Sequence, residues 1–280
     1  MWYLNPPSHT ARSSFMTCIS RIRNKQLQER LKLSEEEVVA AADSYAAAAQ
    51  QTMLHSLDDS DFNLSLVSKD EMIEVYERRM AKKEAAGRAI YDDLISAPAH
   101  GRCPLCGQRI VSTLDHHLPK TLYPALAVDP LNLVPACADC NKLKMNKAPS
   151  ASAEETLHPY FDNVENDPWL HAEVIEIAPA AVRFYVSPPP QWNDTLLRRV
   201  RLHFKTFNLA ALYASQAAQE LNNIKYILSQ ILSKNGPDQV REHLCDQAIS
   251  RRVANINSWQ TATYAALSSS TWFCEGGFEE

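Results

Sequence analysis

Four cysteines in two pairs lie near the middle of the 280-residue chain, and their spacing is that of a zinc site. Cys103 and Cys106 form the first Cys-x-x-Cys pair, and Cys137 and Cys140 form the second after thirty intervening residues. A structural zinc ion takes four ligands in tetrahedral geometry, and two such pairs supply them from two tight turns. Because all four positions are then filled, we expect this metal to fold the segment and not to take part in chemistry.

Residues of other types within and directly after this cysteine frame could carry out a reaction. Asp115 and His116 lie between the pairs, and Asn141 directly follows the second pair. A histidine can take a proton from water near neutral pH. A carboxylate and an amide oxygen can hold one hard divalent cation on a phosphate. The residue types therefore predict hydrolysis of a phosphodiester, provided that the fold brings together His116 and Asn141, which are 25 residues apart.

The order of short motifs across the segment resembles a known family. Cys-x-x-Cys, Asp-His-x-x-Pro, Asn-Leu-x-Pro and Cys-x-x-Cys-Asn-x-x-Lys follow one another within about residues 100–147. This order is similar to that of the HNH endonucleases, the ββα-metal nucleases with zinc knuckles. The resemblance covers near one-sixth of the chain.

Carried over residue by residue, the resemblance implies a complete catalytic site. Asp115 and Asn141 would be ligands of one catalytic Mg²⁺ or Mn²⁺ ion, His116 the general base, and Asn132 the asparagine that fixes the loop holding the base. The four cysteines would hold zinc. The implied activity is hydrolysis of phosphodiester bonds in nucleic acid, with DNA as the expected substrate. The residues expected to contact nucleic acid are Lys120, Lys142 and Lys144.

Two alternatives remain open at this point. In a second register of the double histidine, His116 would bind the metal and His117 would be the base. We prefer the first register because Asp115, His116 and Pro119 then match the Asp-His-x-x-Pro spacing. The alternative from another class is a zinc finger that binds nucleic acid without cleaving it, or a scaffold that depends on a partner.

Composition and charge set the class of the protein. Hydrophobic residues make up 45% and charged residues 22% of the chain, which is typical of a soluble globular protein. No apolar run is long enough for a transmembrane helix, the N-terminus does not match a secretory signal, and the cysteine usage suits a reducing compartment, so we expect a cytoplasmic protein without membrane contact. The net charge of −5 and the modest basic patches indicate weak intrinsic affinity for DNA and favour a partner that delivers the substrate.

Hydrophobic periodicity and capping signals predict a mainly α fold with a small α+β module. Residues 1–99 are expected to be helical, with capping boxes at Ser34 and Ser68 starting helices that reach about His55 and Ile95. Residues 100–148 are expected to form the zinc-bound, treble-clef-like ββα-metal core. Its predicted elements are strands at 110–114 and 132–135 and a helix from Asp139 to Lys147.

Residues 149–280 are expected to form a β-hairpin followed by helices. The predicted strands are 172–177 and 182–186, and the predicted helices are 194–234, with a break near Asn208, and about 237–266. We expect His158 and His171 in turns or at the surface. This surrounding sequence is similar to that of bacterial HNH proteins of mobile elements and anti-phage defence, and the resemblance implies a partner such as an ATPase.

Overall fold

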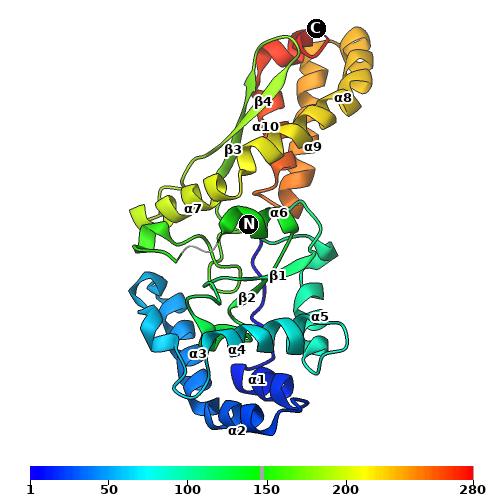
Figure 1. Ribbon diagram of the computed structural model, residues 1–280. Coiled ribbons are helices and arrows are strands. Elements are labelled where there is room, and N and C mark those ends of the chain that lie inside the picture. Colours follow the sequence, from blue (N-terminus) through cyan, green and yellow to red (C-terminus); the bar gives the residue numbers. More distant parts are fainter. Residues whose placement is uncertain (146–147, 280) are drawn as a thin grey trace. The chain divides into compact units, whose positions relative to one another are not determined.

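The computed structural model describes residues 1–145 and 148–279, so Asn146 and Lys147 of the predicted helix lie outside the described residues. The chain divides into two compact units, Met1–Asn163 and Val164–Glu280 (Figure 1). It is mainly helical and carries two small antiparallel hairpins, as predicted. The first unit contains both the expected helical region and the expected module. Within the described residues, no helix has the length and apolar character needed to cross a membrane.

The first unit begins with helices that enter the core one after another. Their bounds are α1 (Ala11–Ile19), α2 (Lys25–Leu33) and α3 (Glu35–Gln50), followed by the 3₁₀ turns η1 (Leu54–Ser56) and η2 (Asp59–Phe62). The predicted capping box at Ser34 is wrong. The Ser34 hydroxyl donates to the Arg30 carbonyl at 3.1 Å because α2 runs almost directly into α3, and Glu37 instead binds the backbone N–H of Ser65.

The second predicted capping box is confirmed, but the helix that follows it is broken. Ser68 accepts from the backbone N–H of Glu71, and the Glu71 carboxylate accepts from that of Ser68 at 2.9 Å. The chain then forms α4 (Lys69–Glu74), the π-helix η3 (Val75–Ala81), a loop, and α5 (Arg88–Ser96). Close packing explains the break: a Cβ on Gly87 would lie 2.5 Å from the Cys18 sulfur, so the loop backbone passes directly against α1.

One hydrophobic core joins these helices to the segment that carries the cysteine frame. It includes buried side chains from the helices, such as Phe15, Tyr45 and Met72, and others from the later segment, such as Leu118 and Leu133. Figure 1 shows α1 to α5 on one side of the short β1–β2 hairpin. The helical region therefore forms one side of the environment in which the candidate site lies.

The predicted order of two strands and a helix is present, with shifted boundaries. β1 (Thr113–His116) pairs antiparallel with β2 (Leu133–Ala136), in a register that places His116 opposite Leu133, and α6 (Ala138–Lys144) follows. The first strand starts later than predicted because Ile110 is instead part of an isolated bridge to Arg102. The remaining short turns of this unit are η4 (Ala99–Gly101), η5 (Pro124–Leu126) and η6 (Ser152–Glu154).

The second unit contains the predicted hairpin and a set of helices. β3 (Leu170–Ile175) pairs antiparallel with β4 (Ala181–Val186), which confirms the hairpin. The helices are α7 (Asp194–Thr206), α8 (Leu209–Asn235), α9 (Pro237–Ala254) and α10 (Trp259–Ser269), followed by the π-helical turn η7 (Phe273–Gly277).

Two turns interrupt the helices of this unit. Asn208, with φ at +49°, ends the helical conformation between α7 and α8, as predicted. The single helix predicted for 237–266 is wrong, because the chain turns at residues 255–258. There the Asn257 side chain accepts from Trp169 N–H at 2.9 Å, and Ser258 caps α10.

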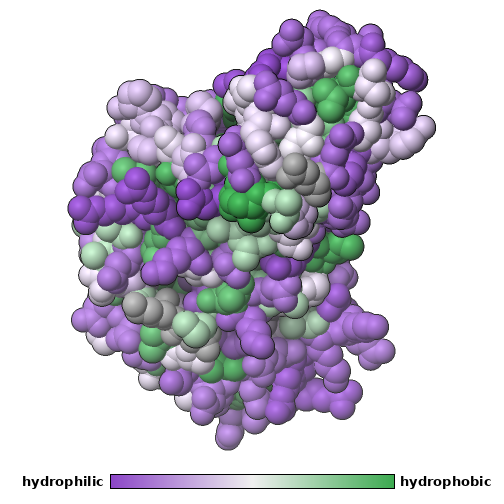
Figure 2. Space-filling view, turned by 90° about the horizontal axis from the view of Figure 1, so that it is seen from above, coloured by the Kyte–Doolittle hydropathy of each residue, from purple (hydrophilic) through white to green (hydrophobic). Residues whose placement is uncertain are grey.

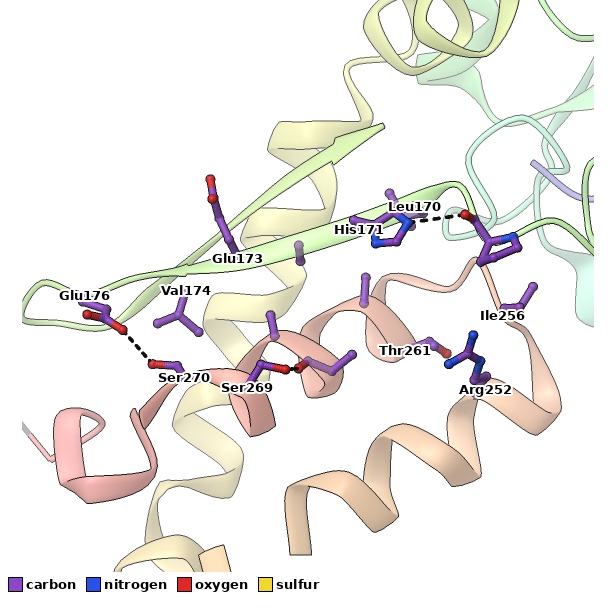
Figure 3. A pocket seen from close by; sticks show the side chains of 15 residues that line it. Leu170, His171, Glu173, Val174, Glu176, Arg252, Ile256, Thr261, Ser269 and Ser270 are labelled. Atoms are coloured by element: carbon purple, nitrogen blue, oxygen red, sulfur yellow. Dashed lines mark hydrogen bonds between the residues drawn. The ribbon is translucent and has the colours of Figure 1, made fainter. Parts of the chain in front are cut away.

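A groove of about 420 Å³ lies between β3 and α10 of the second unit. Figure 3 shows Val174 from the strand and Thr261 and Ser269 from the helix along it, and Ser270 donates to Glu176 at 2.9 Å across one end. On the face drawn in Figure 2, hydrophilic residues predominate and hydrophobic residues form small patches between them. The described residues of this unit contribute no cluster of metal-ligand atoms.

Candidate metal centre and hydrolytic site

The four cysteines of the two Cys-x-x-Cys pairs come together in a buried cluster. The sulfur atoms of Cys103, Cys106, Cys137 and Cys140 all lie within 4.8 Å of one another. A tetrahedral zinc ion with Zn–S bonds of about 2.3 Å requires sulfurs about 3.8 Å apart, so the cluster fits one ion. The predicted four-cysteine cluster is confirmed, and it could hold zinc.

Backbone geometry around each pair favours the thiolate form that zinc requires. Arg109 N–H donates to the Cys106 sulfur at 3.5 Å, and Cys140 N–H donates to the Cys137 sulfur at 3.4 Å. Gly107, with φ at +67°, allows the tight turn after the first pair. The pKa of Cys137 is lowered to about 7, first by the hydrogen bond with the Cys103 thiol and then by that with Cys140, while the contact with Cys106 raises it. Metal binding would release protons from the cysteines, because the thiolate form is the one that binds a metal.

Contacts outside the cluster hold the two pairs against each other. Arg109, just after the first pair, forms a 2.7 Å ion pair with Asp139, which lies inside the second pair. Trp2 N–H donates to the Pro104 carbonyl at 2.9 Å, and the Trp2 ring lies against Gly107. The first residues of the chain thus cover the first turn of the cysteine cluster.

The second pair also fixes the helix that carries Asn141. Cys137 is the N-cap of α6, so Cys140 and Asn141 lie in its first turn. The Lys144 ammonium of the same helix donates to the His116 carbonyl at 2.7 Å and lies 3.1 Å from the Asp115 carboxylate. Asn141 precedes Lys144 by three residues and therefore lies on the same side of α6, the side that faces β1. The Asn141 side chain makes no hydrogen bond to the described residues.

One ring nitrogen of His116 forms a hydrogen bond within the protein, and the other can accept a proton. Its Nε2 lies 2.9 Å from the Ala127 carbonyl oxygen, which can only accept, so Nε2 carries the hydrogen. In the neutral ring the lone pair is then on Nδ1. Burial lowers the pKa of His116 to about 3, so the ring is neutral at physiological pH. The arrangement presents Nδ1 as a proton acceptor.

Asp115 is a buried carboxylate with one cationic partner. Burial raises the pKa of Asp115, and the charge of Lys144 opposes this rise. No side-chain hydrogen bond between the described atoms joins Asp115 to His116, because neighbours in a strand point to opposite faces. The two residues are connected instead through Lys144, which contacts the Asp115 carboxylate and the His116 carbonyl. The surroundings of the Asp115 carboxylate therefore already accommodate one cationic group, the Lys144 ammonium.

Asn132 lies fully buried at the base of the loop between the strands. Its side-chain oxygen accepts from Leu118 N–H at 2.7 Å, and its amide group donates to the carbonyls of Leu118 at 3.0 Å and Leu126 at 3.3 Å. These three bonds tie the two ends of the loop together. They also fix the segment next to Ala127, whose carbonyl orients His116.

The three lysines expected to contact nucleic acid lie in different environments. Lys142 is exposed on α6. Lys120 is half-buried, pairs with Glu77 at 3.2 Å and covers the Tyr76 ring at 4.8 Å. Lys144 is almost fully buried and forms an ion pair with Asp115 that was not predicted from the sequence.

Several residues around the site were missed from the sequence. The Tyr76 ring makes a T-shaped contact with the His116 ring, with centroids 4.5 Å apart, although Tyr76 lies forty residues earlier. The expectation that His158 lies in a turn or at the surface is wrong in its exposure, since the residue is 1% exposed. His158 packs against the His117 ring at 4.2 Å and hydrogen-bonds Tyr45. Aromatic neighbours at residues 160 and 161 were the only local signal of this burial.

Comparisons with known proteins give one distant similarity. Protein ea31 of Escherichia phage lambda is 27% identical to this chain over 236 residues, which is 79% of either chain. No protein-family model and no solved structure matches. The chain is thus similar along most of its length to a phage-encoded protein.

Proposed function

We propose that this protein is a metal-dependent endonuclease of the HNH type that hydrolyses phosphodiester bonds in DNA. The observation that carries the proposal is the His116 ring, whose Nε2 is fixed by the Ala127 carbonyl so that Nδ1 can accept a proton. His116 ends β1 and directly follows the buried Asp115, and Lys144 of α6, the helix that begins at the cysteine cluster, contacts the His116 carbonyl and the Asp115 carboxylate. A binding module would need none of these features.

In this mechanism His116 Nδ1 takes the proton from the attacking water. The Ala127 carbonyl then stabilises the imidazolium, because its hydrogen bond to Nε2 strengthens when the ring becomes charged. Asp115 and Asn141 would hold one Mg²⁺ or Mn²⁺ ion, which would neutralise charge on the phosphate oxygens and assist the leaving oxygen. Tyr76 and the buried surroundings keep bulk water from the ring.

Zinc serves this site indirectly. It would fix the start of α6, and this in turn places Asn141 and Lys144 against β1. Because Lys144 occupies one side of the Asp115 carboxylate, it positions that carboxylate and balances its charge before a divalent ion arrives.

The biological setting is also part of the proposal. We place the protein in mobile elements or anti-phage defence, and the similarity to a phage-encoded protein bears on the first of these two settings alone. The net charge of −5 favours a partner that brings the substrate to the nuclease, and the resemblance to the HNH proteins implies an ATPase in this role.

Plasmid nicking by two matched histidine variants tests this function. With Mg²⁺ or Mn²⁺, the wild-type protein should convert supercoiled plasmid to nicked circles, and EDTA should stop the reaction. His116→Gln should abolish nicking, whereas His117→Gln, which changes a neighbouring ring that packs on His158, should retain most of it. Zinc content and circular dichroism establish that both variants fold.

The results separate the proposed register from its rivals. If His117→Gln abolishes nicking and His116→Gln does not, the base is His117 and the proposed register is wrong. If the protein shifts DNA in a gel without cleaving it, and the shift does not depend on His116, the zinc-finger binding function replaces the nuclease.

A further inference from the structure

A groove with a basic rim lies in the first unit, apart from the residues assigned above. It has a volume of about 580 Å³ and lies between the turn joining α1 to α2 and the segment that runs from the end of η3 into the following loop. Among the described residues that line it, Glu84 alone is acidic. The basic residues along it are Arg21, Arg23, Arg78, Arg79 and Lys82.

Most of this positive charge is not balanced within the protein. Arg78 pairs with Glu74 at 3.0 Å. The other four basic residues, Arg21, Arg23, Arg79 and Lys82, form no ion pair with any residue that the structure describes. Gathering like charges disfavours the folded state unless a ligand of opposite charge is bound. Because the whole chain is acidic, at −5, this groove does not simply reflect composition.

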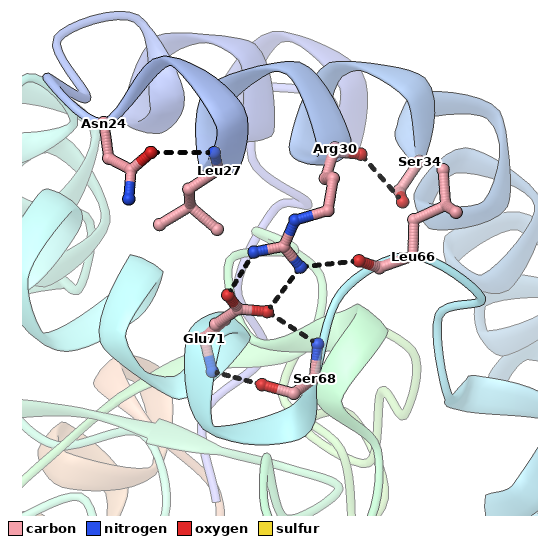
Figure 4. A network of polar contacts seen from close by, with 7 residues as sticks. All are labelled: Asn24, Leu27, Arg30, Ser34, Leu66, Ser68 and Glu71. Carbon is pink, nitrogen blue, oxygen red and sulfur yellow. Dashed lines mark hydrogen bonds and ion pairs between the residues drawn. The ribbon is translucent and has the colours of Figure 1, made fainter.

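The walls of the groove are held in place by a polar network. Figure 4 shows Asn24 capping α2 at Leu27, both of which line the groove. Further along α2, Arg30 binds the Glu71 carboxylate at 2.6 and 3.0 Å and so fastens the helix to the start of α4 (Figure 4). On the opposite wall, the Arg79 carbonyl accepts from Gly87 N–H at 2.8 Å. A groove with fixed walls can bind a ligand without first having to order itself.

The π-helix η3 connects this groove to the proposed catalytic site. Tyr76 and Glu77 face that site, since Tyr76 contacts the His116 ring and Glu77 pairs with Lys120. Arg79 and then Lys82 follow on the groove side. Even at the α-helical rise, Tyr76 and Lys82 are at most about 9 Å apart along the axis, which is roughly three nucleotide steps of a duplex strand.

We propose that this groove binds the phosphate backbone of the DNA that the His116 site cleaves, and this inference rests on the proposed nuclease function. Cationic groups from two separate elements suit several consecutive phosphates better than one small anion. Arginine also binds phosphate oxygens through paired N–H groups. Contacts of this kind position a duplex without reading its sequence.

Double substitutions that remove two positive charges from one wall of the groove test the inference through the equilibrium binding of DNA. Arg21→Gln with Arg23→Gln changes one wall, and Arg79→Gln with Lys82→Gln changes the other. The matched control, Lys32→Gln with Lys69→Gln, removes two exposed charges from the same unit outside the groove. Fluorescence anisotropy of a labelled 20-base-pair duplex would be measured without added divalent ions, from 50 to 200 mM salt. The wild type would also be assayed for plasmid nicking.

Each groove pair should lose about two phosphate contacts. The slope of log K against log salt should therefore become shallower by about 1.8, and affinity at 0.1 M salt should fall at least about tenfold. The control pair should keep the wild-type slope and affinity.

The outcomes separate this inference from the nuclease proposal. If the wild type nicks plasmid but both groove pairs bind like the control, the groove does not hold the backbone and the nuclease proposal stands. If the groove pairs lose affinity while no variant, wild type included, ever nicks DNA, the binding inference is supported and the catalytic proposal falls. Complete displacement of the duplex by 1 mM mononucleotide would also overturn the inference, because the groove would then be a site for a small nucleotide.

Discussion

Replacing Asp129 by asparagine should make the first unit more stable above pH 7 and less stable at acidic pH. Asp129 is 2% exposed, and it lies in the turn that leads to Asn132. One carboxylate oxygen accepts from Leu131 N–H at 3.2 Å, and the other has no hydrogen-bond partner among the described atoms. Burial raises the pKa of Asp129 from 3.8 to about 7, the Leu131 hydrogen bond lowers it, and the charge of Asp43 raises it.

The sign follows from proton linkage. A carboxyl whose pKa is raised on folding does not oppose folding below pH 3.8, opposes it increasingly between pH 3.8 and 7, and opposes it by about 4 kcal/mol above pH 7. Asparagine lacks this ionisation and keeps the oxygen that accepts from Leu131. Its buried amide group would lack an acceptor, which costs about 1–3 kcal/mol. Asp129→Asn should therefore stabilise by about 1–3 kcal/mol at pH 8 and destabilise near pH 4.

Urea unfolding of the full chain measures this difference, with hydrogen-exchange mass spectrometry used to report on residues 1–163. The stability of Asp129→Asn relative to the wild type should change by about 2 kcal/mol between pH 5.5 and pH 8. Asp61→Asn, which removes an exposed charge, should show no such change. If the unfolding free energies of Asp129→Asn and Asp61→Asn both change with pH as that of the wild type does, burial does not disfavour the ionised Asp129 and the reasoning fails.

Three further predictions concern the metals and the ion pairs. A strong chelator should release one zinc ion per chain and unfold the cysteine segment, since structural zinc contributes on the order of 10–16 kcal/mol in finger peptides. A zinc-binding dye measures the released metal and circular dichroism measures the unfolding, while the helices of residues 164–280 should persist. Lys144→Met leaves the buried Asp115 unpaired and should destabilise the protein by about 3–5 kcal/mol. Mg²⁺ should raise the melting temperature of this variant more than that of the wild type. Equal rises in melting temperature would count against Asp115 as a metal ligand. Bonding to Arg30 lowers the pKa of Glu71 to about 2, so its stabilisation is present above pH 4.5 and lost as pH falls toward 2. Glu71→Gln should thus cost about 1 kcal/mol at pH 7, after allowance for solvent screening, and nothing near pH 2 in urea unfolding.

Features set by neighbouring residues were predictable from the sequence. The two Cys-x-x-Cys pairs, the capping box at Ser68, the second-unit hairpin and the helix break at Asn208 each depend on a few adjacent side chains. The strand–strand–helix order of the module was also foreseen, with boundaries off by one to three residues. The catalytic and metal-binding roles of Asp115, His116 and Asn141 stay predictions.

Features set by long-range packing were not predictable. The helix predicted from Ser68 to Ile95 breaks because Gly87 must lie against Cys18, a contact with a helix some seventy residues earlier. The turn at 255–258 exists because Asn257 binds the backbone around Trp169. The burial of His158 depends on Tyr45, more than a hundred residues before it. Local propensity holds no information on any of these partners.

The same distinction applies to the chemistry of the proposed site. The motif supplies the His116 imidazole, but Tyr76 and the helical core supply its dry surroundings, and burial is what lowers its pKa to about 3. The cysteine frame alone, residues 100–148, would retain the thiols and lose Tyr76 together with the core that covers the loop. A motif match therefore predicts which atoms can react, whereas the reactivity of the imidazole is a property of the whole first unit. Substitutions in α1, α3 or η3 should thus affect cleavage even where they lie far from the phosphate.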